Sequence, residues 1–408
     1  MENVAGHEAR QSTERPFSVL AIDKVAVLRN NRARYRMIRQ LADVELTLVA
    51  PERWPENLVM EEYQRDDTDP YTTILGKVSW PGKELLSIYY TGIVKAMRRS
   101  RPDVILMMEE GFSMFALQAL VLQRLFAPRA VMIFYGNHIG SYRRFPYRLF
   151  WFYRIISEIV LPRMQIGFCV NERAEQVLSE SSFRGERRVR FHGINEDLFR
   201  RIPMCQARAE LELPPEGSIF LFAGRLLEQK GVMDLIDAFA SLRAERPGTP
   251  LHLLLVGDGD YGAVLRQRVD ELGLHDAVEF RRAVPVEQVA TYMSAATAFV
   301  LPSRASWKEQ FGRVNAEAML LETTIIGSTS GEIPRIIGEG GFIFRADDVD
   351  DLARTMARVL DDPDEVERRR AIGRQIAVER YSVRGFVNEL IVLFERIAGR
   401  PLGRKGGA

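Results

Sequence analysis

Cysteine and long apolar runs are scarce in this chain. Only Cys169 and Cys205 occur among its 408 residues, which excludes a disulfide framework and a four-cysteine metal site and fits a reducing compartment. No apolar run approaches the roughly 18 residues that a membrane-spanning helix needs. The opening residues, "MENVAGHEARQSTERPF", lack the apolar core of a secretory signal. The sequence therefore predicts a cytoplasmic protein that is soluble or attached only to a membrane surface.

A surplus of one charge sign is also lacking. Lys plus Arg number 56 and Asp plus Glu number 55, which leaves a formal net charge of +1. Such a balance gives no support for nucleic acid as a partner. The apolar share of 46% is that of a folded protein with a core. At roughly 150 residues per domain, this length predicts two or three domains.

Short β-rich runs alternate with longer helical patterns along most of the chain. In the first half the expected strands are 18–22, 44–51, 102–108 and 130–135, and the expected helices are 34–42, 83–100 and 112–126. In the second half the expected strands are 219–225, 251–257, 277–284, 298–303, 323–328 and 341–344. Strands that alternate with helices predict parallel sheets covered on both faces. The fold class expected is therefore α/β, with two doubly wound domains and a ligand between them at the carboxyl ends of the strands.

The alternation stops at a polar, proline-bearing stretch, 191–218, and this break sets the expected domain boundaries. Residues 1–16 are expected to be a flexible tail, and 17–200 an N-terminal Rossmann-like domain. Residues 201–384 would form a C-terminal Rossmann-like domain, and 385–408 a closing helix with a tail.

Two binding signatures overlap in "LLLVGDGDYGAVL" (253–265). Its glycines spell the dinucleotide fingerprint G-x-G-x-x-G, and Asp258 and Asp260 spell D-x-D. A pyrophosphate brought there would meet two like charges, and two carboxylates from one turn rarely suffice for a metal ion. We therefore interpret the stretch as structural: the glycines allow a tight strand-to-helix turn, and the aspartates cap the following helix.

An anion site is indicated upstream, in "FAGRLLEQKGVMDLIDAFASL" (222–242). A buried strand ends at Gly224-Arg225, and Lys230 leads into an amphipathic helix. Two cations at a strand end beside a helix N-terminus suit an anionic ligand. The alternative is a pair of solvated surface charges.

Two carboxylates lie downstream, in "KEQFGRVNAEAML" (308–320). Seven residues separate Glu309 from Glu317. In one continuous helix, about 80° of rotation and about 12 Å would separate them. Because Gly312 interrupts the pattern, we expect Glu309 in a turn and Glu317 on the helix, both facing the cleft. That arrangement would hold one extended polar ligand at two points.

The block 219–344 resembles the nucleotide-binding domain of the family 4 retaining glycosyltransferases (glycosyl transferases group 1), which have the GT-B fold. The resemblance is carried by "FAGRLLEQKG", "LLLVGDGD", "FVLPS", "EQFGRVNAEAM" and "SGEIPRIIGEGGFIF", which occur in the family's order and spacing. "HGINEDLF" (192–199) resembles the segment that enters the interdomain linker. "ERYSVRGFVNELIVLFERI" (379–397) resembles the closing helix that crosses back onto the first domain.

The resemblance implies a site for a nucleotide-diphosphate sugar and no metal cofactor. Arg225 and Lys230 would hold the diphosphate, where fixed cations can stabilise the departing nucleotide. Glu317 would accept hydrogen bonds from the ribose hydroxyls, and Glu309 would contact hydroxyls of the transferred sugar. An ionised carboxylate is an acceptor only, which suits both tasks.

The implied sugar site extends to backbone amides and to the first domain. Amides around Phe311 and Gly312 would orient the sugar, and His138, in the loop "YGNHIGSY" (135–142), would lie near it. The alternative for His138 is a side chain that only caps local structure. One departure from the family is clear: "AIDKVAVLRNNRARY" (21–35) lacks the glycines with which many relatives approach the diphosphate.

The stretch "YRRFPYRLFWFYRIISEIVLPRM" (142–164) combines five arginines, one acid and seven aromatic residues. Basic and aromatic side chains together suit a membrane interface. The alternative is a helix that packs its aromatic side chains into the first domain and leaves its arginines in water.

Three functions are compatible with these features. The first is a retaining glycosyltransferase that moves a hexose-type sugar to a hydroxyl of a glycan, a lipid-linked or a small-molecule acceptor. The second is a GT-B-like sugar-nucleotide epimerase, although its first-domain acid/base carboxylates cannot be placed. The third is a non-catalytic sugar-nucleotide-binding partner, which the retention of Arg225, Lys230, Glu309 and Glu317 disfavours.

Overall fold

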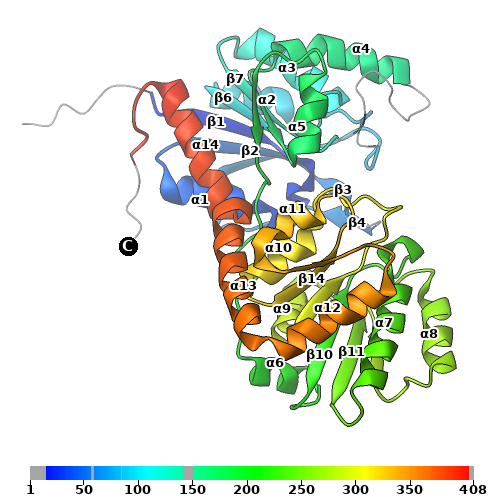
Figure 1. The fold of residues 1–408 in the computed structure, drawn as a ribbon. Helices are drawn as coiled ribbons and strands as arrows, with labels where there is room; N and C mark the ends of the chain where they lie inside the picture. Colours follow the sequence, from blue (N-terminus) through cyan, green and yellow to red (C-terminus); the bar gives the residue numbers. More distant parts are fainter. Residues whose placement is uncertain (1–14, 57–58, 84, 139, 141–149, 404–408) are drawn as a thin grey trace, which may run out of the picture.

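The computed structural model describes residues 15–56, 59–83, 85–138, 140 and 150–403, and in it the chain forms two parallel-sheet α/β domains (Figure 1). The first sheet has seven parallel strands in the order β5-β2-β1-β6-β7-β8-β9. Its strands are β1 (Ser18–Ile22), β2 (Glu45–Pro51), β5 (Thr72–Gly76), β6 (Val104–Met107), β7 (Val131–Gly136), β8 (Ile166–Cys169) and β9 (Glu186–Val189). A separate antiparallel hairpin pairs β3 (Arg53–Glu56) with β4 (Val59–Glu62).

The second sheet has six parallel strands in the order β12-β11-β10-β13-β14-β15. They are β10 (Ser218–Ala223), β11 (Leu251–Val256), β12 (Val278–Arg281), β13 (Ala298–Leu301), β14 (Thr324–Ser328) and β15 (Phe342–Phe344). The first sheet ends at Val189 and the second begins at Ser218, so the expected boundary at residue 200 lies between them. Together the two sheets give the predicted fold class.

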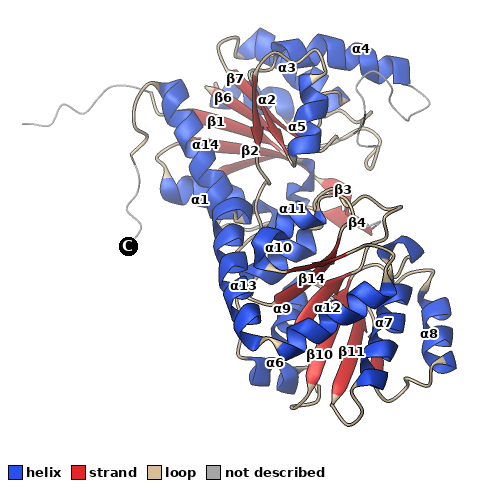
Figure 2. Ribbon diagram, in the orientation of Figure 1, coloured by secondary structure: helices blue, strands red, loops and turns tan. Residues whose placement is uncertain are grey.

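Helices cover both faces of each sheet (Figure 2). Those of the first domain are α1 (Ala33–Leu41), α2 (Ile93–Ser100), α3 (Met114–Phe126), α4 (Phe150–Val160) and α5 (Glu172–Ser179). Those that follow are α6 (Met204–Glu210), α7 (Val232–Glu245), α8 (Gly262–Glu271), α9 (Val286–Ala295), α10 (Arg313–Leu320), α11 (Ile333–Ile337), α12 (Val349–Asp361), α13 (Pro363–Ile376) and α14 (Val383–Ala398). Central strands such as β1 and β6 are buried along their whole length, as a doubly covered parallel sheet requires.

The last helix leaves the second domain and packs on the first. In Figure 1, α13 runs along the second domain and α14 continues toward α1 and the first sheet. The ring of Phe394 lies 5.8 Å from that of Phe17, and Arg188 donates to Glu389 at 2.9 Å. A parallel bridge between Ile194 and Ser382 joins the linker to the start of α14.

One predicted helix is much shorter in the structure. The expected helix 83–100 begins only at Ile93, because Gly92 has φ +81° and ends the preceding loop. A Cβ at Gly92 would lie 2.7 Å from the Leu75 carbonyl oxygen, so the loop and β5 approach each other closely there. Strands β5, β8 and β9 were not predicted.

Candidate functional site

The two predicted cations lie at the carboxyl end of β10, and within the described part of the chain only Lys230 has a partner. Arg225 is exposed, and its guanidinium makes no hydrogen bond or ion pair with the residues that the structure describes. Lys230 forms an ion pair with Glu309, and its Nζ lies 5.7 Å from the centre of the Trp307 ring. The structure thus joins the predicted anion site to the first predicted carboxylate.

Glu309 lies in the loop after β13, as expected, and its position is fixed on several sides. Its carboxylate accepts a hydrogen bond from Ser303 Oγ at 2.8 Å, in addition to the contact with Lys230. Its carbonyl oxygen accepts from the backbone amide of Glu332 at 2.9 Å. Gly331 has φ +55°, and a Cβ there would lie 2.3 Å from the Glu309 carbonyl oxygen. Only glycine therefore allows this close approach of the two loops.

Glu317 lies on α10, also as expected, but it is covered. The helix begins after Gly312, which has φ +60°. The Glu317 carboxylate is 4% exposed and accepts from Arg313 Nε at 2.6 Å. Burial raises the pKa of Glu317, and the charge of Arg313 opposes that rise. A ligand hydroxyl at Glu317 would share this carboxylate with Arg313.

Phe311 belongs to the contact between the domains. Its ring stacks on that of Phe191, with centroids 3.7 Å apart and planes 9° from parallel. Asn171 Nδ2 donates to the Gln310 carbonyl oxygen at 2.6 Å, also across the interface. The loop that carries Glu309 is thus held by the first domain as well as by the second.

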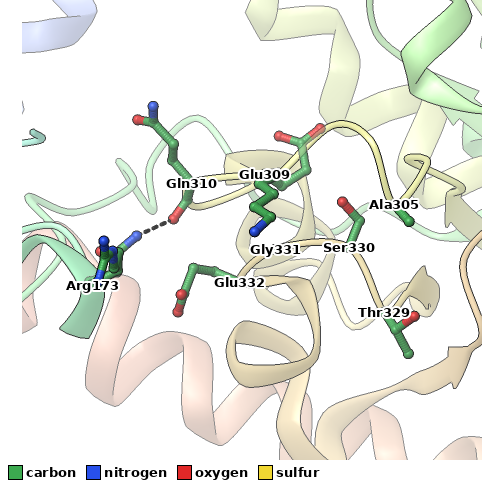
Figure 3. Close-up of a pocket in the computed structure, with 10 residues that line it drawn as sticks. Arg173, Ala305, Glu309, Gln310, Thr329, Ser330, Gly331 and Glu332 are labelled. Atoms are coloured by element: carbon green, nitrogen blue, oxygen red, sulfur yellow. Dashed lines mark hydrogen bonds between the residues drawn. The ribbon is translucent and has the colours of Figure 1, made fainter. Parts of the chain in front are cut away.

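A cavity of about 610 Å³ opens beside Glu309 at this interface. In Figure 3, Ala305, Glu309, Gln310 and residues 329–332 lie around it, and Arg173 faces them from the first domain. A second cavity, of about 470 Å³, lies between the loop after β1, the end of β7 and the start of α10. The cleft expected between the domains therefore contains two separate hollows.

The turn with overlapping glycines and aspartates is structural, but not for the reason expected. Asp258 and Asp260 do not cap α8, which begins after Tyr261 without a side-chain cap. Instead, Asp258 accepts from the Ala283 amide at 3.1 Å. A Cβ at Gly257 would lie 1.8 Å from the Gly224 carbonyl oxygen. The glycine thus lets the turn pack against the loop that carries Arg225.

The described part of the chain contains no group of three or more His, Cys, Asp or Glu residues that could hold a metal ion. His138 follows β7 and is half-buried, with its ring edge-on to Phe112 at 5.0 Å. It is not among the described residues that line the two cavities. Its assignment to the sugar stays a prediction.

Sequence reasoning missed Arg34, on α1, which lines the second cavity with Lys24 and Arg313. A signal was present, because "RNNRARYRMIR" places five arginines directly after the first strand and its loop. The number of arginines in this stretch does not show which of them is buried and which is in contact with solvent.

The stretch 142–164 is described only from Phe150 onward; residues 142–149 lie outside the described residues. Helix α4 buries Tyr153, Ile156 and Val160, which supports the packing alternative for part of its surface. Its outer face exposes Phe150, Trp151, Ile155 and Ile159, at 40–54% each. None of the described helices combines the length and the apolar character needed to cross a membrane.

Residues 205–376 match the family model "Glycosyl transferases group 1". Over 223 residues the chain is 34% identical to the D-inositol 3-phosphate glycosyltransferase of Streptomyces avermitilis, an alignment that covers 52% of this chain and 47% of the relative. It is 31% identical over 174 residues to the MMP alpha-(1->4)-mannosyltransferase of Mycolicibacterium hassiacum, covering 42% and 41%. The matched part thus spans about half the length of these curated relatives, or less.

Solved structures resemble the chain over nearly its whole length. A glycosyltransferase from Rickettsia africae superposes with a TM-score of 0.70 at 14% identity, covering 94% of this chain and 99% of that one. Anabaena HepE in complex with UDP gives a TM-score of 0.65 at 18% identity, covering 93% and 100%. At such low identities the likeness establishes the fold alone, and that fold is GT-B.

Proposed function

Because residues 205–376 form a glycosyl transferases group 1 domain within a GT-B fold, we propose that this protein is a family 4 retaining glycosyltransferase. It would move a hexose-type sugar from a nucleotide-diphosphate sugar to a hydroxyl of a glycan, a lipid-linked or a small-molecule acceptor. The observation that carries the proposal is the pairing of Lys230 with Glu309 at the carboxyl ends of two adjacent strands.

In the proposed complex the donor replaces the Lys230–Glu309 ion pair. Lys230 and the exposed Arg225 hold the diphosphate, and Glu309 accepts hydrogen bonds from the sugar hydroxyls. In the free protein the positive charge of Lys230 and the negative charge of Glu309 compensate each other. Neither charge is therefore unpaired before the donor binds. Backbone amides near Phe311 and Gly312 orient the sugar, and Glu317 accepts from the ribose while it also accepts from Arg313.

The reaction we propose needs no metal. As the glycosidic oxygen of the donor leaves, negative charge develops on the diphosphate, and Arg225 and Lys230 stabilise it at fixed positions. The proposal of a metal-free reaction rests on these two cations.

The solved neighbour HepE binds UDP-glucose, and we propose a nucleotide-diphosphate sugar of that general kind as the donor here.

A screen of candidate donors tests the function. The protein is incubated with UDP-, GDP- and ADP-sugars and mixed hydroxyl acceptors, with and without excess chelator, and nucleoside diphosphate and glycoside products are quantified. We expect one donor to yield both products at equal rates with and without chelator. An isomerised sugar nucleotide without a glycoside would indicate the epimerase, and binding without turnover the non-catalytic partner. A strict need for added Mn²⁺ or Mg²⁺ would contradict the metal-free mechanism.

We further propose that the first domain lies on the cytoplasmic face of a membrane through α4. Support comes from the outward side chains of Trp151 and Ile155, with the exposed Arg154 between them. Apolar and cationic groups on one helix face suit an anionic lipid surface. Sedimentation with anionic vesicles should fall for Trp151→Ser/Ile155→Ser and not for Val392→Ser, an exposed apolar residue on α14. Equal sedimentation of all three proteins would contradict this proposal.

A further inference from the structure

The cavity of about 470 Å³ on the first-domain side of the interface has a wall of cations and amides. Its described lining includes Lys24, Arg34, Asn137, His192, Asn195 and Arg313, and it includes no described aspartate or glutamate. None of Arg225, Lys230 and Glu309 is part of that lining. The hollow is therefore distinct in position from Arg225, Lys230 and Glu309, the side chains assigned to the diphosphate and to the transferred sugar.

Arg34 is the unusual member of this wall. The residue is only 6% exposed, yet its guanidinium donates no hydrogen bond to any residue that the structure describes. The nearest carboxylate oxygen, Asp23 Oδ2, is 4.0 Å away. That oxygen already accepts from Tyr35 Oη at 2.6 Å, and Asp23 Oδ1 accepts from the Val25 amide at 3.0 Å. A guanidinium has five N–H donors, and none of the Arg34 nitrogens is enclosed without a partner, so its donors are accessible to a ligand in the cavity.

The carboxylates that neutralise the other two cations lie behind the wall. Glu109, 2% exposed, pairs with Lys24 at 2.8 Å. Glu317, 4% exposed, pairs with Arg313 at 2.6 Å. An anion in the cavity would therefore lie nearer to the cations than to the carboxylates of Glu109 and Glu317. Attraction by the cations would then exceed repulsion by the carboxylates.

His192, which lines the cavity, shows that the positive charges converge there. Burial lowers the pKa of His192 well below its usual range, and the charges of Arg34 and Arg313 act in the same direction. The His192 ring therefore stays neutral and adds no charge of its own. The carboxamide groups of Asn137 and Asn195 donate to no described residue, so both can donate to a ligand.

We propose that this cavity binds the acceptor through an anionic group, and that the group is a phosphate. The planar fork of Arg34 can donate two parallel hydrogen bonds to phosphate oxygens, and Lys24 and Arg313 supply further charge. Asn137 and Asn195 then bind hydroxyls of the same molecule. This inference rests on the proposed function, because it assigns the acceptor class of the same enzyme. The alternative occupant with the same chemistry is the diphosphate of the donor itself.

Calorimetric titration of inorganic phosphate into protein saturated with UDP separates the two sources. If UDP does not bind, GDP or ADP replaces it. We expect saturable phosphate binding in the presence of nucleotide, at least tenfold weaker in Arg34→Gln. Arg34→Lys, which keeps the charge and loses the fork, should be at least threefold weaker. Lys95→Gln removes an exposed cation on α2 of the same domain and should change nothing. Nucleotide affinity should stay within twofold in every variant.

The variants are chosen so that folding does not decide the outcome. Asp23 keeps its bonds to Tyr35 and Val25 without Arg34, and Arg34→Lys retains the buried charge. Absence of saturable phosphate binding, unchanged binding in both Arg34 variants, or competition between phosphate and nucleotide would each overturn the proposal. Failure of every nucleotide to bind would instead count against the proposed function.

Discussion

The Nζ of Lys230 and the carboxylate of Glu309 form an ion pair between the loop after β10 and the loop after β13. These two strands are neighbours in the second sheet and run parallel, so both loops leave from the same edge. Side chains 79 residues apart in the sequence meet there because of that topology. The pair therefore positions the two groups that the proposed mechanism assigns to the diphosphate and to the sugar.

Removal of either diphosphate-binding cation should abolish most transfer without unfolding the protein. Each of Arg225→Ala and Lys230→Ala should lower kcat/KM by about 10²–10³, because each loses a charge-assisted contact worth about 2–4 kcal/mol in the transition state. Arg354→Ala, which removes an exposed cation on α12, is the control. Initial rates with saturating acceptor measure the effect, and near-normal turnover in both variants would refute the assignment.

A methyl group at Gly331 should impair transfer through the position of Glu309. Its Cβ would lie 2.3 Å from the Glu309 carbonyl oxygen and 2.5 Å from its nitrogen, so the loop must shift. We expect a loss in kcat on the order of 10², as for other small misplacements of a reacting geometry.

Gly273→Ala is the matched control for Gly331→Ala. Gly273 has φ +63°, close to the +55° of Gly331, and no atom lies within 4 Å of its added Cβ. Both variants should lose about 1–2 kcal/mol of stability from the left-handed backbone. Only Gly331→Ala should lose activity. Equal activities of the two variants would show that the contact with Glu309 is unimportant.

The buried His192 should make the protein less stable below neutral pH. Its pKa is lowered by burial, so the folded state stays unprotonated at pH values where the unfolded chain takes up a proton, below about 6.5. The free energy of unfolding should therefore fall by about 1.4 kcal/mol per pH unit from that one site, down to the folded-state pKa.

Denaturant unfolding of His192→Phe between pH 7 and pH 5 measures the contribution of His192. The variant keeps an aromatic ring beside Phe191 and should show a shallower pH dependence than the unmodified protein. His275→Gln removes an exposed imidazole and controls for the loss of a histidine elsewhere. Identical slopes for His192→Phe and the unmodified protein would disprove the contribution.

The alternation of strands and helices in two α/β domains, and the loop-and-helix placement of Glu309 and Glu317, could be predicted from the sequence. Long apolar strands have strong local signals, and β1 and β2 begin within one residue of their expected starts. The short strand β9, "ERRV", carries three charged residues. No apolar pattern identifies it, because its pairing with β8 decides its conformation.

Two site features depended on contacts between distant segments and could not be predicted. The glycines at 257 and 331 allow close approaches to Gly224 and Glu309, and sequence alone shows only that the residues are small. Arg34 looks like any other arginine of an amphipathic helix until the packing places it in the wall of a cavity. In each case tertiary packing supplied the information.

Transfer should keep the anomeric configuration of the donor and pass through no covalent intermediate. A double displacement would need a carboxylate free to attack the anomeric carbon. In the structure Ser303 Oγ donates to the Glu309 carboxylate, and once the donor has replaced the ion pair with Lys230 the mechanism assigns that carboxylate to sugar hydroxyls. We therefore expect a front-face reaction in which the departing diphosphate, held by Arg225 and Lys230, takes the proton of the acceptor hydroxyl as the new bond forms.

On this mechanism the Glu309→Gln variant should keep part of the activity, because an amide still hydrogen-bonds the sugar hydroxyls. It should lose the rest, because the positive charge that develops on the sugar ring is no longer stabilised by a carboxylate. NMR of the product's anomeric proton should show the configuration of the donor, and an inverted linkage would refute the retaining assignment. Intact-protein mass spectrometry of the unmodified protein with donor alone should show no added sugar. A sugar adduct on Glu309 would establish a covalent route, with Glu309 as its nucleophile, even where the configuration is retained.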